Sequence, residues 1–91
     1  MPATVVIVVK ILPESPSTDL VKMKELAKAA LALLGGNNVS FEERPIAFGL
    51  KALIVKTDMP EEKGTDAVEA ALAKLPEVSS VSIEDYRRAF G

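Results

Sequence analysis

Stretches with the apolar pattern of a β-strand alternate along the chain with stretches that have the three- to four-residue spacing of a helix. Residues 4–12 form a nearly continuous apolar run with four valines, which is typical of a central β-strand. Such a run fits a strand that is covered on both faces, or one with a single face left open and apolar. Further strand patterns lie at residues 39–42, 50–57 and 78–83. The pattern therefore predicts four strands.

Between the first two strands, apolar residues repeat at the three- and four-residue spacing of an amphipathic helix. Thr18 or Asp19 can cap this helix, and GGNN at 35–38 ends it, because glycine and asparagine tolerate the left-handed conformation. The residues that form its apolar stripe are Leu20, Met23, Ala27, Ala30, Leu31 and Leu34.

A second helix is expected after a polar loop at residues 59–64. It should begin at Thr65 or Asp66, and Asp66 with Glu69 has the spacing of a capping box. Pro76 closes it. The residues that form its apolar stripe are Val68, Ala71, Leu72 and Leu75.

The order strand, helix, strand, strand, helix, strand predicts an α+β fold of the ferredoxin-like type, βαββαβ. Its four-stranded antiparallel sheet carries both helices on one face. Right-handed crossovers place the first and third strands in the middle. With no internal linker or tandem motif, residues 1–91 are expected to form a single domain. The helix-free sheet face is left to solvent or to a partner.

The composition points away from catalysis and from bound cofactors. The chain has no cysteine and no histidine, which removes thiol catalysis, the commonest general base and the commonest metal ligand. It has no P-loop pattern. The adjacent carboxylates Glu42 and Glu43 should face opposite ways on a strand. We therefore expect no catalytic residue, no metal and no cofactor.

Charge and hydropathy favour a cytoplasmic protein. The net charge is −2 and aromatic residues make up 4% of the chain, whereas an RNA-recognition domain of this element order needs aromatics on a basic open face. No apolar run is long enough to span a membrane, and the N-terminus lacks a signal-peptide layout. We therefore expect neither direct nucleic-acid binding nor membrane binding.

The turn between the second and third strands is unusually apolar. Pro45 cannot donate to a sheet ladder and Gly49 can adopt turn conformations, so PIAFG at 45–49 is expected to form a hairpin tip. Ile46 and Phe48 lie where turns usually carry polar residues. Phe48 either folds back into the core or forms an exposed contact, and the residues alone leave both possibilities open.

The last strand ends with two adjacent arginines, Arg87 and Arg88. They are either solvated charges or a cationic contact for a partner rich in carboxylates or phosphates. Adjacent residues of a strand point to opposite faces, so at most one can reach a given partner group.

These segments together resemble the archaeal translation elongation factor 1-beta family. The similar segments are the opening strand with PESP at 13–16, PIAFGLKAL at 45–53, GTD at 64–66 and DYRR at 85–88. The resemblance covers essentially the whole chain and implies the same ferredoxin-like fold. It also implies guanine-nucleotide exchange, in which elongation factor 1-alpha replaces GDP with GTP and regains the form that carries aminoacyl-tRNA.

The resemblance further implies a partner and a contact site. In eukaryotic relatives, a hairpin phenylalanine and the C-terminal end press against the GTPase near its magnesium and phosphate site, and Phe48 matches that phenylalanine. The expected partner is elongation factor 1-alpha in its GDP-bound form. The expected partner-binding residues are Pro45, Ile46, Phe48, Gly49, Arg87 and Arg88.

The C-terminus departs from the eukaryotic pattern, in which a lysine next to the end reaches the magnesium site. Here the last lysine is Lys74, and Arg87 and Arg88 are the cations nearest the end. An arginine fork is not equivalent to an ammonium group. Two other classes of function stay open: a small-molecule-sensing module of the ACT type, which predicts a ligand-dependent dimer, and a non-catalytic structural subunit of a translation complex.

Overall fold

The computed structural model describes residues 3–90, and within them it contains four strands, two α-helices and two short 3-10 turns. In chain order these are β1 (Thr4–Pro13), α1 (Leu20–Leu33), β2 (Asn37–Pro45), η1 (Ala47–Gly49), β3 (Lys51–Pro60), η2 (Glu61–Lys63), α2 (Gly64–Ala73) and β4 (Val78–Phe90).

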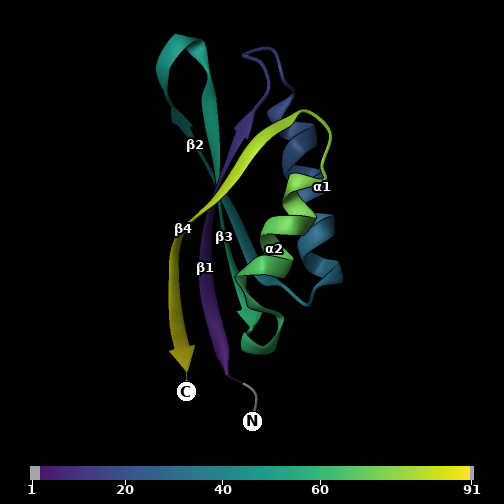
Figure 1. Cartoon of the computed structure of the whole chain (residues 1–91), viewed down its shortest axis with the longest axis vertical. Coiled ribbons are helices and arrows are strands. Elements are labelled where there is room, and N and C mark those ends of the chain that lie inside the picture. Colours follow the sequence, from purple (N-terminus) through teal and green to yellow (C-terminus); the bar gives the residue numbers. More distant parts are fainter. Residues whose placement is uncertain (1–2, 91) are drawn as a thin grey trace.

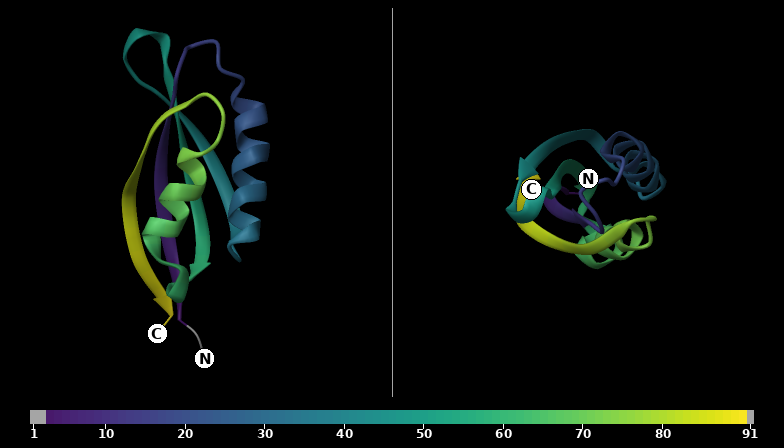
Figure 2. Two further views of the ribbon diagram at one scale, coloured as in Figure 1. Left: turned by 45° about the vertical axis from the view of Figure 1, so that its right-hand side comes forward. Right: turned by 90° about the horizontal axis from the view of Figure 1, so that it is seen from above.

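The four strands form one antiparallel sheet in the order β2-β3-β1-β4. Both helices lie on one side of this sheet (Figure 1; Figure 2). The opposite side, which carries neither helix, is called the open face below. The predicted ferredoxin-like fold is confirmed, with the first and third strands in the middle as right-handed crossovers require.

Strand β1 alternates between a buried side and a half-buried side. Val5, Ile7, Val9 and Ile11 are fully buried beneath the helices, whereas the residues between them lie on the open face and are half-buried. Of the two situations that the apolar run allowed, the structure shows the second: one covered face and one open, apolar face.

Helix α1 follows the predicted pattern closely. Asp19 is the N-cap, and its carboxylate accepts a hydrogen bond from the backbone N–H of Lys22 at 3.2 Å. Met23, Ala27 and Leu31 of the predicted stripe are buried in the core.

The predicted start of the second helix is wrong. Helix α2 begins at Gly64, and no side chain caps it. Asp66 lies inside its first turn, so the expected capping box with Glu69 does not form. The backbone sets this start, because Gly64 lies at the junction of η2 and α2 with φ 71° and ψ 166°, a conformation that glycine adopts readily. The interaction of Asp66 with the positive helix terminus remains favourable in the first turn.

The expected polar loop at residues 59–64 is also wrong in its first part. Strand β3 continues to Pro60, and Met59 pairs with Val5 and is 1% exposed. Met59 faces the helices because it occupies a position two residues along from buried Thr57. The strand ends where the backbone N–H of Glu61 donates to the carbonyl of Ala3 at 3.0 Å.

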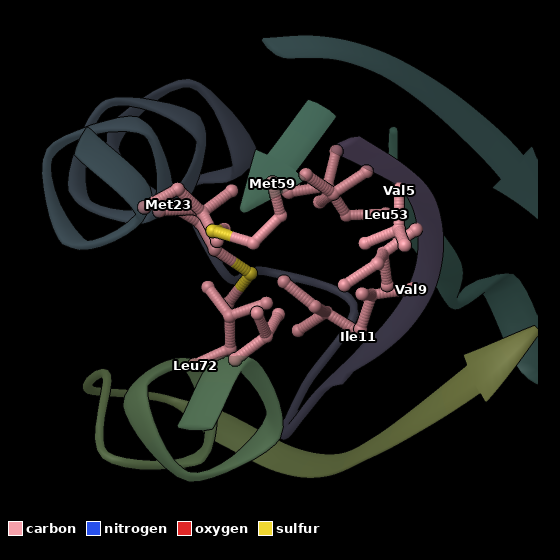
Figure 3. Packing of buried hydrophobic residues seen from close by; sticks show 12 residues of the cluster. Val5, Val9, Ile11, Met23, Leu53, Met59 and Leu72 are labelled. Carbon is pink, nitrogen blue, oxygen red and sulfur yellow. The ribbon is translucent and has the colours of Figure 1, made fainter. Parts of the chain in front are cut away.

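The core lies between the sheet and the two helices. Met23 of α1, Met59 of β3 and Leu72 of α2 extend from three elements into one cluster with buried residues of β1 such as Val5, Val9 and Ile11 (Figure 3). Methionine side chains are flexible enough to fill an irregular space of this kind. Neither described helix is long and apolar enough to cross a bilayer.

Candidate partner-binding site

The hairpin between β2 and β3 closes tightly. The ladder between the two strands runs as far as the pair Pro45 and Lys51. Beyond it, residues 46–50 form the hairpin tip, closed by a hydrogen bond of 2.8 Å from the N–H of Ile46 to the carbonyl of Leu50. A second bond, from the N–H of Leu50 to the carbonyl of Ala47 at 3.2 Å, completes the single turn η1.

Phe48 points out of the molecule at this tip. Its side chain is 94% exposed, which settles the question of whether it folds back into the core. Its backbone has φ 62° and ψ 31°, the left-handed conformation, and Gly49 follows with φ 77°. This conformation costs a residue with a Cβ atom about 1–2 kcal/mol, while glycine adopts it freely. An aromatic side chain is thus held in solvent on a strained backbone.

The other expected hairpin residues differ in exposure. Pro45 and Gly49 are exposed, and Ile46 is half-buried. Phe48 is therefore the large apolar side chain that the tip presents to a partner.

The two arginines near the C-terminus lie on opposite sides of β4. Arg87 pairs in the ladder with Val6, which lies on the open face, and Arg88 pairs with Val5, which is buried under the helices. Arg87 therefore belongs to the open face and Arg88 to the helix side, as the two-residue period of a strand requires.

Both guanidinium groups have carboxylate partners. The Nε of Arg87 lies 2.9 Å from the Oδ2 of Asp85 on the same strand. Arg88 donates to the carboxylate of Glu61 in η2, and this contact raises the pKa of the Arg88 guanidinium. Sequence reasoning missed both partners. Asp85 follows from the period of the strand, but Glu61 lies 27 residues away and no local pattern connects it to Arg88.

Two hollows flank this part of β4. One, of about 440 Å³, is lined by the open-face residues Val6, Val8, Lys56, Asp85 and Arg87, and also by Arg88, which follows Arg87 on the strand. The other, of about 520 Å³, lies where α2 begins and is lined by Lys63, Gly64, Thr65, Asp66, Ile83 and Tyr86. Tyr86 is 45% exposed and was not among the expected contact residues. The feature of the sequence that could have indicated Tyr86 is its position as an aromatic residue directly before the paired arginines.

The hairpin tip and the arginines do not form one compact site. The hairpin lies at one end of the long axis of the molecule and the C-terminal end of β4 at the other (Figure 1). This axis measures 44 Å, against 21 Å and 19 Å across it. A single partner that contacts both must extend along most of the molecule.

Metal-ligand geometry is not apparent in the part of the chain that the structure describes. Residues 3–90 contain no group of three side chains able to hold a metal ion. The charged side chains of Arg87 and Arg88 are each paired with a carboxylate of the same chain.

Comparison with known proteins finds the same family over most of the chain. A family described as the EF-1 guanine nucleotide exchange domain matches residues 6–89, a span that includes both the hairpin tip and the arginines. Elongation factor 1-beta of Methanocella arvoryzae is 40% identical over 89 residues, or 97% of this chain and 99% of that protein. The protein of the same name from Methanosarcina acetivorans is 46% identical over 81 residues (87% and 91%). The one from Methanobrevibacter smithii is 45% identical over 85 residues (92% and 94%).

Proposed function

This chain belongs to the EF-1 guanine nucleotide exchange domain family, and from that membership we propose that it promotes the exchange of GDP for GTP on elongation factor 1-alpha. It acts in the cytoplasm by binding the GDP-bound GTPase, and it contributes contacts in place of a catalytic residue. The observation that carries the proposal is Phe48, which is 94% exposed on a left-handed backbone at the hairpin tip. Strain of this kind clusters at functional sites.

Exchange requires no bond chemistry from this chain. A GTPase holds GDP through its phosphate loop and magnesium ion. Contacts that form only when that site is distorted weaken nucleotide binding by the same free energy, because coupling between two ligands is reciprocal. A coupling of about 3–4 kcal/mol accelerates GDP release several hundred-fold, at ~1.4 kcal/mol per tenfold. The nucleotide that returns is then set by the ratio of GTP to GDP.

The arginines have different roles in this proposal. Arg87 lies on the open face beside a hollow and is the group that engages the partner. Arg88 faces the helix side, where its pair with Glu61 ties the end of β4 to η2. On binding, Arg87 exchanges Asp85 for an acidic group of the partner, and the interface desolvates the new pair.

The direct test is release of fluorescent GDP from purified elongation factor 1-alpha, with excess unlabelled GDP, with and without this protein. We expect faster release that saturates with the protein concentration. Unchanged release together with stable binding would favour the structural-subunit alternative. A dimer that forms only with a small molecule, and no effect on release, would favour the ACT-type module.

A further inference from the structure

One ion pair joins the two edges of the sheet across the open face. Arg44 lies on β2 and Glu84 on β4, and both β3 and β1 lie between these strands. Three strand spacings separate the edges of a flat sheet by about 14 Å. Yet the Nη1 of Arg44 lies 3.0 Å from the Oε1 of Glu84. The sheet therefore curls around its open face, and the view from above shows β2 and β4 bending to the same side, away from the helices (Figure 2).

An irregularity in β4 makes this contact possible. Asp85 pairs with Val8 and Ile83 with Val9, so Glu84 is an extra residue in the ladder. Such a bulge bends a strand and increases its twist. As a result, Asp85 remains available to Arg87 while Glu84 reaches across the face to Arg44.

The position of the pair links the two ends of the candidate site. Arg44 directly precedes Pro45, where the β2–β3 ladder ends and the hairpin tip begins. Glu84 lies three residues before Arg87 on β4. We propose that Arg44 and Glu84 are positioning residues, which hold the hairpin end of β2 against β4 and so fix where Phe48 lies relative to Arg87. This role rests on the proposed exchange function, because it concerns how one partner reaches both ends.

The physical effect is preorganisation. Both side chains are partly exposed, 46% for Arg44 and 31% for Glu84, and an ion pair of this kind adds little to global stability. Its effect appears instead in binding, because a partner that contacts both ends pays less when their spacing is already set. Removing the pair should therefore raise the concentration of protein needed for half-maximal exchange and leave the maximal rate unchanged.

The chain offers a matched control. Arg44 has a second carboxylate partner, Glu42, whose Oε2 lies 3.5 Å from its Nη2, but Glu42 is on the same strand and bridges nothing. Glu84→Gln and Glu42→Gln each replace one carboxylate partner of the Arg44 guanidinium with a neutral amide. Only the first cuts the connection between the sheet edges.

In the GDP-release assay, we expect Glu84→Gln to raise the half-saturating concentration about three- to fivefold, the equivalent of ~1 kcal/mol. The maximal rate should stay within twofold, and Glu42→Gln should behave as the unmodified protein. Arg44→Gln combined with Glu84→Gln should be no worse than Arg44→Gln alone, because the second change removes a bond that is already lost.

A measurement on the free protein tests the geometry separately. The chain has no cysteine, so spin labels can be attached through Ala47→Cys at the tip and Ala70→Cys on α2, which packs against β4. We expect the distance distribution between the labels to broaden in Glu84→Gln and to stay unchanged in Glu42→Gln. If the two variants match each other in both experiments, the positioning role is overturned. If the unmodified protein does not accelerate GDP release from elongation factor 1-alpha, the proposed function fails. The spin-label distances still decide whether the ion pair fixes the position of the hairpin tip.

Discussion

At the scale of single residues, Phe48 has two features that stability does not account for. It exposes an aromatic ring, and it occupies a left-handed conformation that asparagine or glycine would adopt at lower cost. The sequence predicted the turn, because Pro45 and Gly49 carry the chemistry of one. It could not predict the backbone of Phe48, because Gly49 offered the obvious left-handed position and the tight five-residue loop requires two in succession.

Phe48→Ala should therefore weaken binding to the GTPase by ~2 kcal/mol or more, as truncation of an aromatic anchor does. Thermal stability should barely change, because the ring has almost no neighbours to lose. Isothermal titration calorimetry measures the loss of binding, and thermal melting measures the change in stability. Phe48→Asn should bind as poorly as Phe48→Ala while melting at the same or a higher temperature, since asparagine tolerates the left-handed conformation.

The matched control for this prediction is Leu33→Ala. Leu33 is 88% exposed on α1 and is equally apolar, but it lies outside the hairpin. A loss of binding in Leu33→Ala as large as that in Phe48→Ala would mean that the partner does not select the hairpin. A large drop in the melting temperature of Phe48→Ala would assign the ring a structural role.

At the scale of elements, β4 shows that a strand pattern predicts the face on which a side chain lies but not its partner in another element. Its two-residue period places Arg87 and Arg88 on opposite faces, and this was predictable from adjacency alone. The partner of Arg88 was not, because Glu61 belongs to a turn that was expected to be a loop.

Single alanine variants should separate the two arginines. Arg87→Ala should slow exchange by the equivalent of ~2 kcal/mol if the contact is desolvated, whereas Arg88→Ala should cost under ~1 kcal/mol and fade with salt. Exchange rates over a range of ionic strength measure both. Lys28→Ala, which removes an exposed cation from α1, is the control for net charge. Two arginine variants that behave like Lys28→Ala at low salt would reduce both groups to solvated charge.

The contact between α1 and β2 has its own pH dependence. Lys24 lies 2.9 Å from the carboxylate of Glu43, and this hydrogen bond holds the pKa of Glu43 below its usual 4.5. Because the folded state binds the proton less tightly than the unfolded chain, the pair stabilises the fold above that usual value. Its contribution is lost as the pH falls through the lowered pKa.

Glu43→Gln should therefore melt a few degrees below the unmodified protein near neutral pH, and the two should converge in acid. Melting temperatures measured from acid to neutral pH follow this directly, with Glu69→Gln, an exposed carboxylate of α2, as the control. A difference that persists unchanged at the acid end would assign the effect to packing of the side chain instead of its charge.

At the scale of the whole molecule, the order of elements was enough to predict the fold. Two helical stripes and four strand patterns allow few packings, and right-handed crossovers fix which strands are central. The curl of the sheet was not predictable, because it depends on a bulge at Glu84 that leaves no local signal. The ion pair with Arg44 depends on that curl, so the sequence could not indicate how the hairpin tip and the arginines are connected.

The separation of the two contact regions leads to the last prediction. Residues more than 7–10 Å apart that share no partner group usually contribute independently, within about 0.5 kcal/mol. Phe48 belongs to the hairpin tip and Arg87 to the C-terminal part of β4, and these two parts lie at opposite ends of a molecule 44 Å long (Figure 1). If one GTPase molecule contacts both, the loss of binding in Phe48→Ala with Arg87→Ala should equal the sum of the single losses. A double variant no weaker than the weaker single would mean that the two contacts are coupled, since a contact that forms only together with the other is already lost in the single variant.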